Sequence, residues 1–429
     1  MKIVFVTTFP GPEAGGGMGR VAHELAAASA RVHEVLLICP GEETSMGPSV
    51  PGQPTVLRVA ARGKGDVLLP DLRGRRQLHA RLASFRPQVV HAHDFGPLAL
   101  WLQDWAHSTG CPFVMTLHCL PSQAQAFSSL EKPLVTKRIA NSRLFAAFVD
   151  HFLRRCDGVI ALNQAIVDDL RRMGYTGPVY RVPNGRDLAA YHALPPADVT
   201  QPQKHLLFVG SFTRRKNQRY LLEMMEHLAV PARLTLVGEP LERGYLAELR
   251  TYQRVQCLDG VDLLGPLPYE NIPPLLARTH VFVSASRLEV QSLAVIEALA
   301  SATPVVGLAN ETIDELVDDV VGKRLPAGTS PAEFAHQVQR ICTLPPPQYE
   351  ALCRAARERV RALDWQAVVE ENRRVYGELA TVCAERSPRS ARIWTPWLVA
   401  ASALRYGLSD LAHPGAARQR RTRARPQQA

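Results

Sequence analysis

The sequence predicts an α/β protein of two doubly wound, Rossmann-like domains that face each other across a cleft. Three observations predict this fold class. The chain has 429 residues, more than one ordinary domain needs. Short apolar runs alternate with segments of helical spacing along most of it, which is typical of parallel βαβ units. Between 184 and 204 the alternation stops in a stretch containing Pro195, Pro196 and Pro202, which indicates a linker.

The first series of predicted strands lies before this linker. Each strand is a short apolar run, and segments such as 21–30 and 164–173 between the runs have helical spacing. The predicted strands are residues 2–7, 35–39, 88–92, 113–117, 158–162 and 178–182. We therefore assign residues 1–183 to a first domain and 184–204 to the linker.

A second series follows and predicts a second domain over residues 205–385. Its strands are residues 205–210, 233–238, 261–264, 281–284, 303–307 and 322–325. A long helical stretch from 349 to 384 closes this domain, and residues 386–429 form a basic, partly apolar tail. Ligands of such sheets bind beyond the carboxyl ends of the strands, so functional residues are expected in the loops there.

Charge and cysteine content exclude several classes of function. The formal net charge is +10, but the tail holds nine Arg and one acid, so the rest of the chain is nearly neutral. No nucleic-acid-binding motif accompanies these charges, and we expect no nucleic-acid partner. Eight scattered cysteines without a C-x-x-C pair favour a reducing cytoplasm over a disulfide framework or a metal site. The apolar start is too short for a signal peptide, and no run reaches the roughly 18 residues of a membrane span.

The stretch from 284 to 304 holds the main candidate site. Ser292 is the expected N-cap of a helix that starts at Leu293, and free amides at a helix start suit a diphosphate. Glu289 lies in the loop before this helix, and Glu297 lies about one and a half turns into it. Because ionised carboxylates only accept hydrogen bonds, both suit sugar or ribose hydroxyls. The pattern alone also fits a surface loop acid and a helix-face acid.

A glycine-rich segment follows the first strand. Gly15, Gly16 and Gly17 precede a helix expected to begin near Arg20, and their backbone amides can approach a phosphate or sugar closely. The segment lacks the third glycine of a dinucleotide fingerprint. A mobile loop is the alternative interpretation.

Basic and imidazole side chains supply the remaining candidates. Arg215 and Lys216 follow the first strand of the second domain, where a solvated helix start is the alternative. His118 ends the strand at 113–117, at the expected edge of the cleft. His91 and His93 point to one face of a strand, but no third ligand is evident, so we interpret them as core or cleft-lining residues rather than a metal site.

The spacing Glu289-x7-Glu297, followed by Ala298-Leu-Ala and Pro304-Val-Val, resembles the donor-site motif of retaining glycosyltransferases of family 4. Those enzymes have the GT-B fold of two facing Rossmann-like domains. The resemblance extends over about residues 1–380 and rests on the order and spacing of its motifs. The other motifs are Gly15-Gly-Gly, Val89-Val-His-Ala-His, Thr116-Leu-His, Val182-Pro-Asn-Gly-Arg-Asp, Phe208-Val-Gly and Arg215-Lys-Asn.

This resemblance implies roles for the candidate residues. Glu297 would bind the nucleotide ribose, and Glu289 would lie against the donor sugar. Arg215 and Lys216 would bind the diphosphate and stabilise the departing nucleotide without a metal. His118 would contact the transferred sugar. No cofactor beyond the nucleotide-sugar co-substrate is expected.

Four positions depart from the family pattern. Cys119 stands where an Asp often follows the histidine, and Ser211 stands where an Arg often follows the glycine. Arg186 replaces a usual apolar residue, and Ala302 replaces a usual glycine. Ser211 leaves Arg215 as the expected second phosphate ligand, and the identity of the sugar stays open.

The predicted function is retaining transfer of a hexose from a nucleotide-diphosphate sugar to a hydroxyl acceptor. We favour a lipid acceptor at an anionic membrane surface, with a cytoplasmic, peripheral location. The apolar and basic segment 121–155 and the tail residues Trp394 and Trp397 suggest this, and this half of the chain looks similar to diacylglycerol and phosphatidylinositol glycosyltransferases.

Three alternatives remain at this point. The first is a soluble or polysaccharide acceptor. The second is a dinucleotide-dependent oxidoreductase or epimerase, against which the missing G-x-G-x-x-G counts. The third is a catalytically silent scaffold, against which the intact His118, Lys216, Glu289 and Glu297 count.

Overall fold

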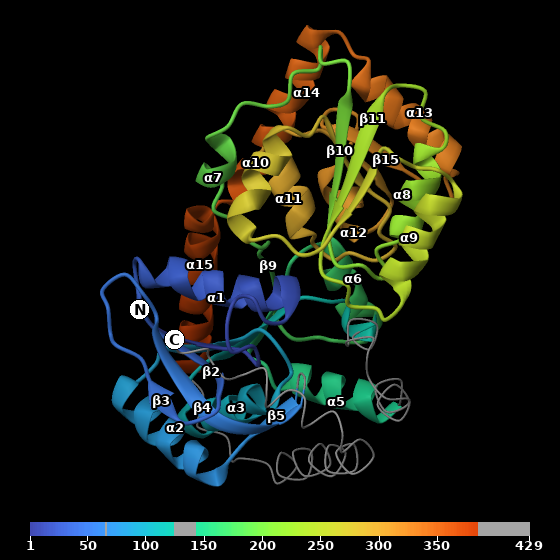
Figure 1. The fold of residues 1–429 in the computed structure, drawn as a ribbon. Helices are drawn as coiled ribbons and strands as arrows, with labels where there is room; N and C mark the ends of the chain where they lie inside the picture. Colours follow the sequence, from blue (N-terminus) through green and yellow to red (C-terminus); the bar gives the residue numbers. More distant parts are fainter. Residues whose placement is uncertain (65–66, 124–142, 385–429) are drawn as a thin grey trace, which may run out of the picture.

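The computed structural model describes residues 1–64, 67–123 and 143–384, which form two α/β domains placed one against the other (Figure 1). Each domain is built on its own sheet, with helices on the faces of the sheet. Every strand predicted from the sequence is present, apart from small shifts at the ends. This is the predicted two-domain α/β architecture.

The first sheet has the strand order β3-β4-β2-β1-β6-β7-β8-β9, with β5 paired to β4. Its central strand, β1 (Lys2–Val6), pairs in parallel with β2 (Glu34–Gly41) and β6 (Val89–Ala92). The other strands are β3 (Ser45–Met46), β4 (Thr55–Lys64), β5 (Val67–Pro70), β7 (Phe113–Leu117), β8 (Gly158–Ala161) and β9 (Val179–Arg181). The accompanying helices are α1 (Gly16–Ala30), α2 (Leu72–Phe85), α3 (Pro97–Thr109), α5 (Arg143–Arg154) and α6 (Gln164–Arg172).

The sequence prediction missed β3, β4 and β5 near one edge of this sheet. β4 alternates buried and exposed side chains, as Leu57, Arg58 and Val59 show, so it lacks the continuous apolar run of the central strands. β3 and β5 pair antiparallel with β4, which places them outside the βαβ pattern.

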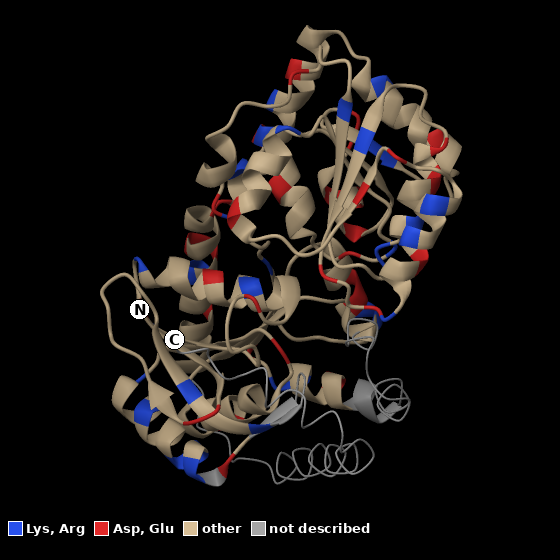
Figure 2. Ribbon diagram, viewed as in Figure 1, with Lys and Arg blue, Asp and Glu red and all other residues tan. Residues whose placement is uncertain are grey.

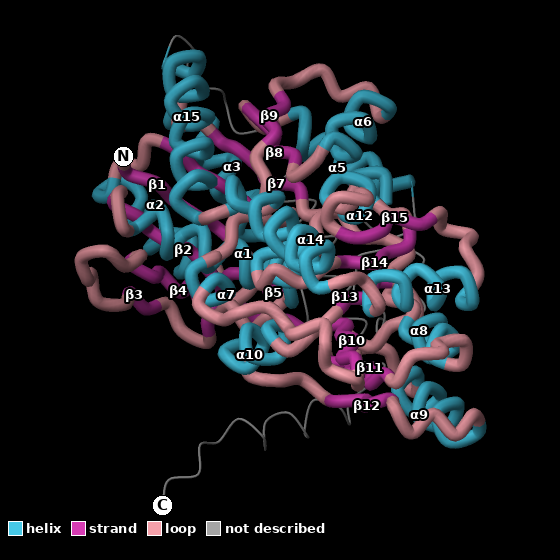
Figure 3. Tube along the Cα trace, turned by 90° about the horizontal axis from the view of Figure 1, so that it is seen from above, coloured by secondary structure: helices cyan, strands magenta, loops and turns pink. Residues whose placement is uncertain are grey.

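The second sheet is parallel throughout, in the order β12-β11-β10-β13-β14-β15, which Figure 3 shows from above. The strands are β10 (Lys204–Val209), β11 (Ala232–Val237), β12 (Val261–Leu264), β13 (Val281–Ser284), β14 (Val305–Leu308) and β15 (Gly322–Leu325). The helices are α8 (Gln218–Met225), α9 (Tyr245–Val255), α10 (Ile272–Ala277), α11 (Leu293–Ala300), α12 (Glu311–Leu316), α13 (Pro331–Cys342) and α14 (Pro346–Arg359). A short α7 (Ala189–His192) lies in the linker.

The predicted helical stretch from 349 to 384 is two helices. α14 ends at Arg359, a turn follows, and α15 (Trp365–Ala384) runs back to the first domain (Figure 1). Val368, Tyr376 and Leu379 of α15 share a buried cluster with Ile3 and Phe5 of β1. The expectation that this helix stays with the second domain is therefore wrong, because its apolar face packs against the first sheet.

The chain consequently crosses between the domains twice, and the two crossings lie side by side. Arg186 in the linker pairs with Asp364 in the return passage through an isolated parallel bridge. The amide of Arg186 donates to the carbonyl of Leu363 at 2.8 Å, and the amide of Trp365 donates back to the carbonyl of Arg186 at 3.2 Å. These hydrogen bonds therefore hold the linker and the return passage together.

Charged residues of both signs are interspersed over both domains, as Figure 2 shows. Among the described helices, none combines the length and the apolar character that crossing a membrane requires. The basic tail and most of the segment 121–155 lie outside the described residues. In the described part of that segment, Val149 and Phe152 of α5 are buried in the first-domain core, and Phe148 packs against it.

Candidate active site

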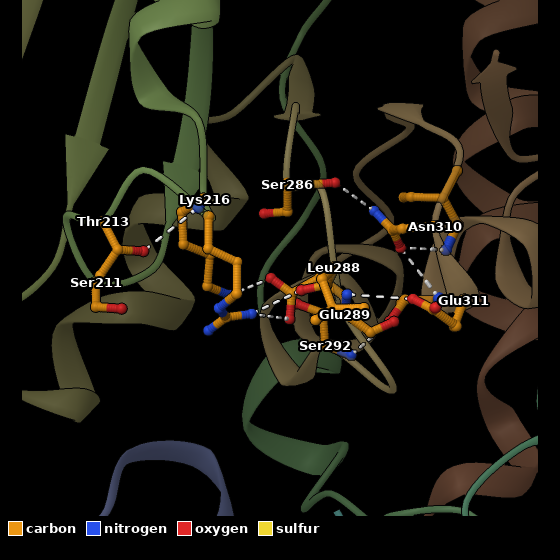
Figure 4. A network of polar contacts seen from close by, with 12 residues as sticks. Ser211, Thr213, Lys216, Ser286, Leu288, Glu289, Ser292, Asn310 and Glu311 are labelled. Carbon is orange, nitrogen blue, oxygen red and sulfur yellow. Dashed lines mark hydrogen bonds and ion pairs between the residues drawn. The ribbon is translucent and has the colours of Figure 1, made fainter. Parts of the chain in front are cut away.

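The loops after β10 and β13 bring Lys216 and Glu289 into direct contact. The ammonium of Lys216 forms an ion pair with Oε1 of Glu289, and Figure 4 shows the two side chains pointing toward each other. Nη1 of Arg215 lies 3.8 Å from Oε2 of Glu289 and donates to the carbonyl of Leu288 at 2.6 Å. The two predicted cations and the predicted loop carboxylate therefore form one cluster.

This cluster is buried, which sets its electrostatics. The side chains of Lys216 and Glu289 are only 12% and 11% exposed. Burial acts to raise the pKa of the Glu289 carboxyl, but the charges of Lys216 and Arg215 outweigh burial and hold that pKa below its usual value. Glu289 is therefore an ionised acceptor near neutral pH, suited to hydroxyl groups.

The start of α12 holds the loop that carries Glu289. The side chain of Asn310 caps α12 by accepting from the amides of Thr312 and Ile313, and its Nδ2 donates to the carbonyl of Ser286 at 2.9 Å (Figure 4). Oγ1 of Thr312 accepts from the amide of Ser292 at 2.9 Å. Ser292 is the N-cap of α11, as predicted, although its hydroxyl makes no capping hydrogen bond.

The glycine segment forms the first turn of α1. The helix begins at Gly16 and not near Arg20, because Gly15 takes the left-handed conformation, with φ of 77°, as its N-cap. A Cβ added at Gly15 would overlap the ring of Phe9, so glycine is required there. A Cβ at Gly17 would lie 3.6 Å from Cδ1 of Leu293. The glycine turn therefore lies against the start of α11, across the domain boundary.

Glu297 lies in a separate buried network. Nη2 of Arg186 contacts Oε1 of Glu297, and the hydroxyl of Tyr269 donates to the same oxygen at 2.8 Å. Nη1 of Arg186 pairs with Glu24 of α1. Burial opposes the charge on Arg186, but Glu297, Tyr269 and Glu24 raise the pKa of the guanidinium. Arg186, which departs from the family pattern, therefore lies in the site region. The sequence interpretation did not assign it to the site.

His118 belongs to a stack of three histidines. The ring of His93 stacks on those of His91 and His118, with centroids 4.4 and 5.3 Å away. Both ring nitrogens of His91 are occupied, Nδ1 by the hydroxyl of Tyr376 at 2.6 Å and Nε2 by that of Thr116 at 2.7 Å. Across the part of the chain that the structure describes, no group of His, Cys, Asp and Glu is arranged to hold a metal ion.

The protonation of this stack follows from its burial. Burial lowers the pKa of His118 to about 4 and that of His91 to about 3, so the rings are neutral near pH 7. Nδ1 of His93 lies 3.0 Å from Nε2 of His118, while Nε2 of His93 is buried and has no hydrogen-bond partner among the described residues. Since buried N–H groups are rarely left unpaired, the proton of His93 belongs on Nδ1. His118 then carries its own proton on Nδ1 as a hydrogen-bond donor.

The structure therefore gathers the predicted residues into three neighbouring groups. They are the cations with Glu289, the glycine turn with Leu293, and the Glu297 network; His118 lies in the stack at the end of β7. Sequence reasoning missed Tyr269, Glu24 and Thr312, whose roles depend on contacts between distant segments. A signal existed for Arg186 alone, as a charge at a position that is usually apolar.

Two family models match the chain in succession. The model for Glycosyltransferase Family 4 matches residues 15–190, and that for Glycosyl transferases group 1 matches residues 203–343. The first match includes the glycine turn and His118, and the second includes Arg215, Lys216, Glu289 and Glu297.

Curated relatives and solved structures agree with these matches. The chain is 26% identical over 422 residues to a glycogen synthase of Mycobacterium tuberculosis, covering 91% of this chain and 97% of the relative. It is also 26% identical over 398 residues to a GDP-mannose-dependent α-(1-6)-phosphatidylinositol dimannoside mannosyltransferase of the same species, covering 89% and 97%. Anabaena HepE, solved with UDP, superposes with a TM-score of 0.67 at 19% identity, covering 89% of this chain and 100% of HepE. The chain belongs to the family 4 glycosyltransferases and has their GT-B fold.

Proposed function

We propose that this glycosyltransferase moves a hexose from a nucleoside-diphosphate sugar to a hydroxyl acceptor with retention of the anomeric configuration. The contact of Lys216 with Glu289, beside Arg215 and the N-terminus of α11, carries the proposal. Two cations and free helix amides suit a diphosphate, and the ionised carboxylate suits sugar hydroxyls. That the mannosyltransferase relative is GDP-mannose-dependent and that HepE was solved with UDP support this class of donor.

The reaction breaks the bond between the anomeric carbon and the phosphate oxygen and forms a bond from that carbon to the acceptor oxygen. The acceptor proton passes to the departing phosphate on the same face of the sugar, so no enzyme nucleophile is needed. Lys216 and Arg215 stabilise the charge that grows on the phosphate, which leaves no step that requires a metal. Glu289 and His118 would hold the sugar, the first as an acceptor and the second as a donor of hydrogen bonds.

Binding of nucleoside diphosphates tests the donor half of the proposal. Calorimetry with UDP, GDP and ADP should show one base bound by the wild type, and the same ligand should raise the melting temperature by mass action. Lys216→Met should weaken this binding while Arg214→Met, at a neighbouring exposed cation, should not. The donor assignment fails if none of the three nucleotides binds.

For the acceptor we propose a membrane lipid. The second relative acts on phosphatidylinositol dimannoside by its name, and the tail 386–429 carries Trp394, Trp397 and nine Arg, a composition that suits anionic bilayers. A peripheral position at the cytoplasmic face of the membrane follows from this proposal.

A polysaccharide acceptor is the second candidate. The glycogen synthase relative is matched over 97% of its length, and the described apolar face of α5 packs into the protein core rather than outward. A soluble glucan would need neither the tail nor a bilayer.

One experiment separates the two acceptors. Full-length protein and a 1–385 form would be given radiolabelled donor with either phosphatidylinositol liposomes or a glucan primer. The lipid proposal requires label in the liposome pellet and less of it with the 1–385 form. Label in the glucan alone, equal for both forms, supports the second candidate. NMR of the initial product shows whether the configuration is retained, and activity after EDTA treatment tests the metal-free step.

A further inference from the structure

We propose that Arg186 is a positioning residue that orients Glu297 so that one carboxylate oxygen stays free to receive the ribose hydroxyls of the donor. This inference rests on the proposed function, because it assumes a nucleotide at Glu297. Family members usually carry an apolar residue here, so the device would be a feature of this chain.

The two protein partners of Glu297 share one oxygen. Nη2 of Arg186 and the hydroxyl of Tyr269 both contact Oε1. In the described part of the chain, no hydrogen bond to Oε2 is found. A carboxylate held in this way has one oxygen fixed by the protein and the other available as an acceptor for ligand hydroxyls.

Proton accounting supports a fixed arrangement. The hydroxyl of Tyr269 has one proton, which it donates to Glu297, so it accepts from Nη2 of Arg186 and from the hydroxyl of Tyr191. Every donor in this chain of contacts therefore ends at Oε1 of Glu297. Turning the carboxylate away from these donors would leave Tyr269 and Arg186 without their acceptor, which is costly in a buried place.

The backbone and the charges around Arg186 are fixed as well. Its side chain is 2% exposed and its backbone is bonded on both sides to the return passage. Glu24 on α1 takes Nη1, and Arg20, one turn earlier, lies 3.7 Å from Glu24 and 4.0 Å from the ring centre of Tyr269. A buried ion pair contributes little net stability, and we therefore assign its role here to orientation.

This arrangement also links the donor groups across the domain boundary. Glu24 and the glycine turn lie on the same helix, α1, while Glu297 and Leu293 lie on α11. Arg186, in the linker, bonds to both helices. The side chain of Arg186 thus sets the position of the Glu297 carboxylate relative to the glycine turn.

The test compares a nucleoside diphosphate with its 2′,3′-dideoxy analogue, using UDP or GDP, whichever the wild type binds more tightly. Only a nucleotide with ribose hydroxyls can use Oε2 of Glu297. We expect the wild type to prefer the hydroxylated ligand by a factor on the order of tenfold or more. In Arg186→Met and Glu297→Gln this ratio should fall toward one, mainly through weaker binding of the hydroxylated ligand.

If the role of Arg186 were merely structural, Arg186→Met would weaken the binding of both ligands equally and leave the ratio unchanged. That result would overturn the inference. Tighter binding of the nucleotide by Arg186→Met would also overturn it, because Arg186 would then compete with the ribose. If Arg186→Met does not fold, as judged by circular dichroism, Arg186→Lys and Tyr269→Phe take its place. Each should lower the ratio, and an unchanged ratio in both contradicts the proposal.

The outcomes separate this inference from the proposed function. A wild type that binds neither UDP nor GDP refutes the proposed donor. A normal ratio in Glu297→Gln refutes the ribose role of Glu297. A ratio that falls in Glu297→Gln but not in the folded Arg186 variants refutes the role of Arg186 alone.

Discussion

The carbonyl of Val290, the residue after Glu289, accepts a hydrogen bond from Nδ2 of Asn163 in the other domain. The side chain of Val290 is 2% exposed and lies in the core of the first domain, although the loop that carries it, between β13 and α11, belongs to the second. Gln291 reinforces this anchor, because its Oε1 accepts from the amide of Asn184 at 2.6 Å. The loop that carries Glu289 is therefore positioned by contacts from both domains.

Val290→Ala should weaken this anchor measurably. The substitution removes two buried methyl groups, each worth about 0.8 kcal/mol, so the free energy of unfolding should fall by about 1.5 kcal/mol. Urea denaturation measures it, with Val320→Ala as the matched control, because Val320 is 57% exposed. Equal losses for the two variants would show that Val290 is not part of the core.

Lys216→Met should lower kcat much more than it weakens binding of the acceptor. Lys216 is the buried cation on Glu289 and, under the proposed function, it faces the departing phosphate. Removing one preorganised charge-stabilising group lowers kcat by a factor on the order of 10²–10³. Initial rates at saturating donor measure the loss.

The matched control for this variant is Arg214→Met. Arg214 precedes the site residues and pairs with Glu248 and Glu242 at the surface, away from Glu289. Its kcat should stay near that of the wild type. Similar losses in both variants would attribute the effect to general surface charge and contradict the role of Lys216.

Much of this architecture could be predicted from the sequence, because local signals specify it. Apolar runs of the right length marked the central strands, and the spacing of Glu289 and Glu297 marked the loop and helix around α11. Contacts between distant segments could not be predicted. The positions of α15 under the first sheet and of Val290 in the first-domain core depend on how the two domains meet.

Ala302 illustrates a departure that the sequence revealed and the structure explains. It follows the C-cap of α11 with φ of 60°, in the left-handed region. The amide of Thr303 bonds to the carbonyl of Ala298, and that of Ala302 to the carbonyl of Leu299, which is the Schellman arrangement. The usual glycine at this position is therefore a requirement of the helix end, and alanine is tolerated at a cost.

Ala302→Gly should consequently stabilise the protein. The left-handed conformation costs an alanine about 1–2 kcal/mol, and glycine avoids this cost. Glycine also makes the unfolded chain more flexible, which lowers the free energy of unfolding by about 0.4–1 kcal/mol. We expect a net gain of about 0.5–1 kcal/mol in the free energy of unfolding, measured in urea. Ala298→Gly, in the interior of the same helix, should instead lose about 1 kcal/mol. A loss at both positions would contradict the strain assigned to Ala302.

The histidine stack should make stability depend on pH. Burial holds the pKa of His91 at about 3, below its ordinary value of 6.5, so the folded protein keeps this ring neutral where the unfolded chain protonates it. Between those two values the unfolded state binds more protons, so stability falls as the pH falls from about 6.5 toward 3. His118, with a pKa of about 4, acts in the same direction over a narrower range.

His91→Gln should therefore flatten the acid side of the stability profile. Well below pH 6.5, a histidine that stays neutral only in the folded state contributes a slope of about 1.4 kcal/mol per pH unit. The free energy of unfolding, measured in urea at intervals from pH 7.5 to 4.5, should fall less steeply in the variant by about that amount, even if its stability at pH 7.5 is lower. His336→Gln is the control, because that ring is 62% exposed, and its profile should follow the wild type. An unchanged slope in His91→Gln would mean that the folded protein admits a proton to this ring, which the burial of the ring opposes.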